Sequence, residues 1–215
     1  MDWIDKLERR WGRYGIPNLV NALMIGQLAV GLFILIVDWR ALTFLSLDRY
    51  ALLHGQIWRL VTFLFQPIWL GGFLGILNLF FYFWIGNSLT RVWGDFRMTL
   101  FLALGMVGAW ISCLLTGGAS PDAIFLSMLF AYTWLWPNQG VLLFGIIPFK
   151  MKYLGWFELA VWVYNFIFSS NITRLSLVLG LAGFLAFFGR EIFYWCKDTI
   201  MGYKRRRDWE NRYRR

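Results

Sequence analysis

Two side chains near the middle of the chain are the first candidates for chemistry. Ser120 and Asp122 stand at the beginning of an apolar stretch within 117–138, GGASPDAIFLSMLFAYTWLWPN. A serine becomes a nucleophile when a hydrogen-bonded base, usually a histidine, accepts its proton. The one histidine of the sequence, His54, lies in a distant segment. Asp122 is the alternative, because a buried carboxylate can act as a base or as a nucleophile.

Three further polar residues lie inside apolar stretches, where polar side chains are costly and usually serve a function. Glu158 and Asn165 are seven residues apart, so they share one face of a helix. Asn78 lies in an earlier apolar stretch. For Asn78 and Asn165, the alternative to a functional role is a hydrogen bond between neighbouring helices.

Asp122 has three structural alternatives. It pairs with Arg174, faces the lipid head groups, or caps its helix beside Pro121. Metal sites draw several His, Cys, Asp or Glu ligands, and no such residues cluster along this chain. The sequence also lacks a phosphate-binding loop and a dinucleotide fingerprint. We therefore expect neither a metal nor a cofactor.

The composition is that of a membrane protein. Of the 215 residues 59% are hydrophobic and 15% are charged, whereas soluble domains carry roughly a quarter charged residues. We expect an amphipathic N-terminal segment (1–17), one membrane domain (18–196) and a basic tail (197–215). The net charge of +9 does not predict nucleic-acid binding, because the basic residues flank apolar blocks and would face anionic lipid.

The apolar blocks predict an all-α protein with six transmembrane helices, since about 20 apolar residues cross the hydrocarbon layer. The expected spans are 18–37, 69–89, 98–115, 121–136, 154–168 and 175–195. The connection 38–68 is expected to lie along the membrane surface as short helices. The connection 137–153 is expected to be an apolar, re-entrant-like segment.

The basic residues orient this arrangement. With a cytoplasmic N-terminus, 17 of the 21 Lys and Arg residues lie on the cytoplasmic side, as the positive-inside rule requires. Both termini are then cytoplasmic. Small residues should mark the helix contacts, because they let backbones approach closely within a membrane. Gly105 and Gly108, together with Gly180 and Gly183, place the third, fourth and sixth spans at the centre of the bundle.

Four stretches, in order along the chain, resemble the rhomboid superfamily of intramembrane proteins: HGQIWRLVTFLFQP, ILNLFFYFWIGNSLTRVWGDFR, WPNQGVLLFGIIPFKMKYL and LGLAGFLAF. The resemblance covers most of the chain and implies a rhomboid-like bundle of six helices with a membrane-associated first loop. The residues that match its motifs are Trp58, Arg59, Asn78, Gly86, Gly94, Pro137 and Asn138.

The catalytic positions of that family do not match. The nucleophile position falls on Asp122, or on Ser120 if the alignment slides by two residues, and Ser120 is then followed by Pro121 instead of glycine. The position of the histidine base falls on Gly180. The loss of such a base lowers the rate by several orders of magnitude. The resemblance therefore implies a catalytically inactive member, similar to the pseudoproteases and the Derlin-like proteins.

The expected function is to bind transmembrane segments of client proteins, at a lateral gap beside the second and fifth spans, in quality control, sequestration or chaperoning. One alternative is an intramembrane protease with an unorthodox site at Ser120 or Asp122. Another is lipid scrambling or transport, which Asp122, Glu158 and Asn165 would favour if they faced one continuous path. The compact form resembles bacterial members, so we expect a multi-pass protein of a bacterial plasma membrane.

Overall fold

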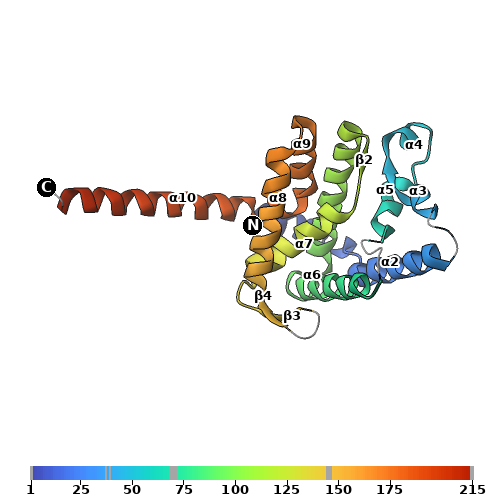
Figure 1. Cartoon of the computed structure of the whole chain (residues 1–215). Coiled ribbons are helices and arrows are strands. Elements are labelled where there is room, and N and C mark those ends of the chain that lie inside the picture. The colour runs from blue at the N-terminus through green and yellow to red at the C-terminus, as the bar shows by residue number, and fades with distance from the viewer. Residues whose placement is uncertain (1, 37, 39, 68–71, 144–146, 214–215) are drawn as a thin grey trace.

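The structure is a computed structural model. It describes the backbone of residues 2–36, 38, 40–67, 72–143 and 147–213, and the side chains of 3–36, 38, 40, 42–67, 75–141, 149–198 and 201. Most of the described chain is helical, in agreement with the predicted all-α class (Figure 1). The basic side chains of 202–215, expected to face anionic lipid, lie outside the described residues.

The elements follow one another in this order: α1 (Asp2–Trp11), η1 (Gly12–Tyr14), α2 (Leu19–Ile36), α3 (Ala41–Leu45), β1 (Leu47–Asp48), α4 (Arg49–Leu53), α5 (Arg59–Thr62), η2 (Phe63–Phe65), α6 (Gly72–Thr116), β2 (Gly118–Ala119), α7 (Asp122–Leu135), β3 (Gly140–Leu143), β4 (Ile147–Lys150), α8 (Met151–Phe168), α9 (Asn171–Gly180) and α10 (Ala182–Tyr213).

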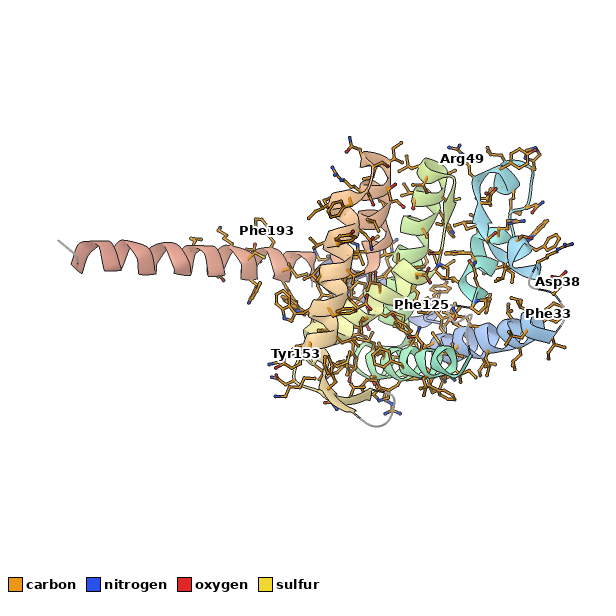
Figure 2. All side chains as sticks on the ribbon, in the orientation of Figure 1. Phe33, Asp38, Arg49, Phe125, Tyr153 and Phe193 are labelled. Carbon is orange, nitrogen blue, oxygen red and sulfur yellow. The ribbon has the colours of Figure 1, made fainter. Side chains whose placement is uncertain are left out.

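Two helices of the described chain are long and apolar enough to cross a membrane. They are α2, with a mean hydropathy of 2.3, and the 42 residues Gly75–Thr116 of α6, with a mean hydropathy of 2.1. The bent pair of α9 and α10 adds a third if it counts as one span. Large apolar side chains lie on the surface, as expected for lipid contact; Ile36 is 81% exposed, and Figure 2 shows Phe33 and Phe193 pointing outward.

Breaks within α6 and after α9 change the expected path of the chain. Gly94 has φ 80° and ψ 167°, a conformation suited to glycine, and divides α6 into two halves. The expected turn between the second and third spans is thus a single-residue break. The predicted sixth span, 175–195, was wrong as a continuous helix, because α9 and α10 meet at Leu181 with a bend of 81°. Figure 1 shows α2, the first half of α6 and α10 running across the direction of α8 and α9.

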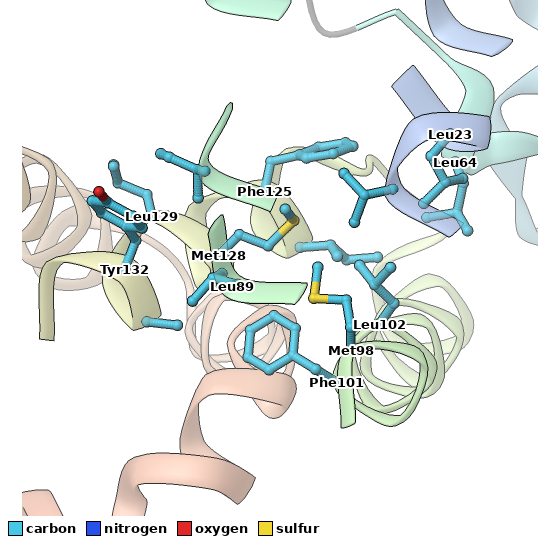
Figure 3. Packing of buried hydrophobic residues seen from close by; sticks show 14 of the residues in the cluster. Leu23, Leu64, Leu89, Met98, Phe101, Leu102, Phe125, Met128, Leu129 and Tyr132 are labelled. Carbon is cyan, nitrogen blue, oxygen red and sulfur yellow. The ribbon is translucent and has the colours of Figure 1, made fainter. Parts of the chain in front are cut away.

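Small residues form the centre of the fold, as predicted for the third, fourth and sixth spans. A Cβ added at Gly105 would lie 3.2 Å from Ile124 of α7. One added at Gly183 of α10 would lie 2.8 Å from the carbonyl oxygen of Phe101 in α6. Around these contacts, Phe101, Met128 and their neighbours form a continuous apolar core (Figure 3). The close approach of these helices packs α6 directly against α7, α9 and α10.

The first loop forms short helices, as predicted, and it is held by Arg59. This side chain is only 7% exposed. Its Nη1 donates to the carbonyl oxygens of Thr43 and Ser46, each at 2.6 Å, and its Nε donates to Oε1 of Gln56 at 2.7 Å. The loop also contains β1, which pairs antiparallel with β2 in the segment before α7. The start of α7 is therefore fixed by the first loop.

The connection after α7 differs from the prediction. Instead of a re-entrant-like segment, it forms an antiparallel hairpin of β3 and β4, in which Gly140 faces Lys150. Pro137 cannot continue the helix, because it lacks an amide donor. Its carbonyl oxygen instead accepts from the amide of Lys152 at 3.0 Å and closes the base of the hairpin.

The amphipathic N-terminal segment forms the expected helix, α1, and is tied to the bend of α6. Arg97 contacts Glu8 at 2.6 Å and Asp5 at 2.9 Å, and Ile4 of the same helix is buried. We expect Arg97→Gln to free α1 at a cost of about 1 kcal/mol, because partly exposed ion pairs contribute little more than that. Amide hydrogen exchange over 3–11 should accelerate in the variant. Arg91→Gln, with an exposed side chain, is the matched control and should leave this exchange unchanged.

Candidate functional site

A groove with a volume of about 340 Å³ lies between α6, α7, α8 and α9. Its polar lining consists of Tyr82, Ser120, Asp122, Glu158 and Asn165. Its apolar lining consists of Ala123, Leu126, Val161, Trp162, Leu177 and Leu181. Four polar residues that the sequence singled out for different reasons are thus brought to one place.

Local structure explains how these residues reach the groove. Ser120 follows β2, whose pairing with β1 holds the chain just before α7. Asp122 is the first residue of α7, and Pro121 precedes it with helical backbone angles. Glu158 and Asn165 come from one face of α8, which confirms the spacing prediction. The polar side of the groove is therefore formed by the start of α7, which the first loop holds in place, and by one face of α8.

No histidine accompanies Ser120 among the described residues that line the groove. His54 is exposed at the end of α4, where its Nδ1 lies 2.7 Å from the carbonyl oxygen of Tyr50 and its ring packs 4.0 Å from the Tyr50 ring. Gly180, the position expected for a base, packs on α7: a Cβ there would lie 2.5 Å from Cβ of Ala123. A histidine at this position has no room without separating α9 from α7.

The ion pair with Arg174, one of the three alternatives for Asp122, is not formed among the described residues. The Arg174 guanidinium donates to the carbonyl oxygens of Phe166 and Ile167, both at 2.8 Å, and to Oδ1 of Asn171 at 3.3 Å. These acceptors terminate α8 and begin α9, so Arg174 closes that turn instead. Asp122 is exposed and lines the groove at the start of α7.

Neither asparagine forms the interhelical hydrogen bond that was its alternative. Asn78 and Asn165 are both exposed, and among the described residues neither side chain has a hydrogen-bond partner. Asn165 lines the groove, whereas Asn78 does not. Asn165 therefore remains a candidate for a function in the groove, and Asn78 has no assigned role.

Three of the other motif residues have structural roles. Gly86 permits close packing, because a Cβ there would lie 2.5 Å from Val20 of α2 and 2.9 Å from Met128 of α7. Gly94 forms the break in α6, and Pro137 closes the hairpin base. Trp58 and Asn138 are exposed and lie outside the groove. Gly86, Gly94 and Pro137 thus shape the scaffold, while the groove is lined by other residues.

Sequence reasoning missed Tyr82 and Trp162. Trp162 lies four residues after Glu158 and three before Asn165, so helical spacing alone places it on the same face. Tyr82 lies four residues after Asn78 in the expected second span, so the two residues share a helix face. Tyr82 lines the groove and Asn78, one turn earlier, does not. The two differ in their position along α6, and only the tertiary structure determines where along α6 the groove lies.

The described residues contain no group of three or more His, Cys, Asp or Glu side chains that would hold a metal. Cys113 is buried and Cys196 exposed, and both are free thiols. No model of a known protein family matches the sequence, and none of the curated proteins compared with it matches either.

Proposed function

We propose that this chain is a catalytically inactive rhomboid-like membrane protein that binds transmembrane segments of client proteins in the groove between α6, α7, α8 and α9. The proposal includes six spans with both termini in the cytoplasm of a bacterium. It requires α2 and the first half of α6 to share the membrane with α8 and α9. Quality control, sequestration and chaperoning are the roles that such binding would serve.

One observation carries the proposal: the groove combines an open, partly apolar lining with a serine that no histidine accompanies. Ser120 and Asp122 lie at its edge, while Gly180 is pressed against Ala123. The same helix α8 also carries exposed apolar side chains outside the groove, including Trp156 at 65% and Phe157 at 63%. An apolar surface beside a polar groove suits a helical segment that moves in from the lipid.

Binding is tested by photo-crosslinking in native membranes. The full-length protein carries benzoylphenylalanine in place of Trp162, which lines the groove, or of Ile111, which is 43% exposed on the second half of α6. We expect membrane-protein adducts from position 162 and far fewer from position 111. Equal labelling from both positions, or adducts with lipid alone, would contradict client binding.

Catalysis is tested separately with purified protein and a model transmembrane substrate. We expect no cleavage above the uncatalysed rate, because a serine without a base remains protonated. Cleavage that disappears in Ser120→Ala would establish a serine protease. Cleavage that survives Ser120→Ala and disappears in Asp122→Asn would establish the aspartate mechanism.

A second candidate is lipid scrambling, which is favoured by the common exposure of Asp122, Glu158 and Asn165 in one groove. Polar groups along a membrane groove offer a path for head groups. The measurement is dithionite bleaching of a fluorescent lipid in vesicles that contain the protein. Bleaching of both leaflets, lost in Asn165→Leu, would favour scrambling over client binding.

A further inference from the structure

The charge of the groove identifies the class of client. Asp122 and Glu158 line it from two different helices, and no Lys, Arg or His belongs to its lining. The whole chain carries a net charge of +9, so the negative charge of the groove is opposite in sign to the charge of the protein. This local sign is a property of the site and does not follow from the composition.

The two carboxylates have no cationic partner among the described residues. Arg174, one of the alternatives considered for Asp122, donates instead to the carbonyl oxygens of Phe166 and Ile167. No ion pair or hydrogen bond involves the side chain of Glu158 within the described chain. The Tyr82 hydroxyl, at the same groove, likewise has no hydrogen-bond partner there.

The groove is long enough to hold one long basic side chain of a helix that packs against it. Glu158 lies seven residues after the start of α8 and therefore about 10 Å along it, and Asn165 lies about 10 Å further. The groove thus extends over roughly two to three helical turns, with Asp122 and Ser120 at the end where α7 begins. A lysine or arginine stem lies along the apolar lining while its charged end reaches a carboxylate.

We propose that the groove selects transmembrane segments that carry a basic side chain within the bilayer. This rests on the proposed function and narrows its client class. A basic residue in hydrocarbon is costly, and an unpaired carboxylate at the groove is costly too. Pairing them removes both costs, whereas a purely apolar segment leaves the carboxylates unpaired.

The test uses full-length protein with benzoylphenylalanine at position 162, in vesicles of phosphatidylcholine and phosphatidylglycerol. Synthetic leucine-alanine segments of about 20 residues carry Lys, Leu or Glu at one central position. We expect the Lys segment to crosslink about tenfold more than the Leu segment, and the Glu segment less than either. In the double variant Asp122→Asn, Glu158→Gln, the ratio of Lys to Leu should fall to about one.

Two further variants sharpen the result. Asp95→Asn removes an exposed carboxylate at the bend of α6, outside the groove, and should keep the preference for Lys. Glu158→Lys should shift the preference to the Glu segment. Circular dichroism and thermal unfolding in detergent verify that each variant is folded.

The outcomes separate this inference from the function on which it rests. Equal crosslinking of all three segments overturns the charge selection and leaves client binding intact. Crosslinking of none of them, or of lipid alone, overturns client binding itself. A preference for Lys that survives in the double variant overturns the assignment to Asp122 and Glu158.

Discussion

Arg59→Ala is expected to lower the free energy of unfolding by about 3 kcal/mol, because hydrogen bonds to a charged group contribute about 1.5–3 kcal/mol each. The substitution removes three donors at once and leaves the carbonyl oxygens of Thr43 and Ser46 without this partner. The measurement is unfolding by sodium dodecyl sulfate in mixed micelles, followed by tryptophan fluorescence.

Two further variants test whether the contacts of Arg59 cause this loss of stability. Arg59→Lys keeps the charge but not the planar fork, so it should recover only part of the loss. Arg40→Ala removes an exposed side chain of the same loop and should change stability by less than about 0.5 kcal/mol. If Arg40→Ala cost as much as Arg59→Ala, the contacts of Arg59 would not be what holds the loop.

The effect of Arg59→Ala should reach the groove. The loop that Arg59 holds contains β1, which pairs with β2 immediately before Ser120. Hydrogen exchange at 118–119 should therefore accelerate in Arg59→Ala, while exchange in the middle of α8 stays slow. This pattern distinguishes a local release of the start of α7 from global destabilisation.

Gly108→Ala is the second large effect, and it tests the centre of the fold. An added Cβ would overlap the carbonyl oxygen of Leu179 and lie 3.0 Å from Cβ of Ala182. A backbone oxygen cannot move without displacing α9, so we expect a loss of about 1–3 kcal/mol, the range for overpacked cores. The same micelle unfolding experiment measures it.

Gly189→Ala is the matched control for this substitution. It also lies in a helix, but an added Cβ there meets nothing within 4 Å. Alanine stabilises an unobstructed helix position by roughly 0.5–1 kcal/mol, so the two glycine variants should shift stability in opposite directions. Because α9 also carries Leu177 to the groove, Gly108→Ala should in addition weaken crosslinking from position 162. Equal effects of the two variants would contradict the close approach of α6 and α9.

The sequence alone places its one histidine in the first loop, far along the chain from Ser120, and the structure keeps His54 outside the groove. The spacing of Glu158 and Asn165 determined that they share a helix face, because helical periodicity is a local property. The long apolar stretches predicted the helical class, and two of the described helices are long and apolar enough to cross a membrane.

Partnerships between distant residues were decided by the tertiary structure. The sequence left three alternatives open for Asp122, and the structure rules out the pair with Arg174, because that guanidinium donates to the backbone carbonyl oxygens at the end of α8. Asn78 and Tyr82 lie one turn apart on the same face of α6, and only the tertiary structure determines that the groove reaches Tyr82 and not Asn78. The bend at Leu181 and the hairpin after α7 escaped prediction because the contacts of Gly180, Gly183 and Pro137 produce them. Composition and periodicity therefore determined the helical class and which residues share a helix face. Packing between helices decided which polar groups meet and which remain without a partner among the described residues.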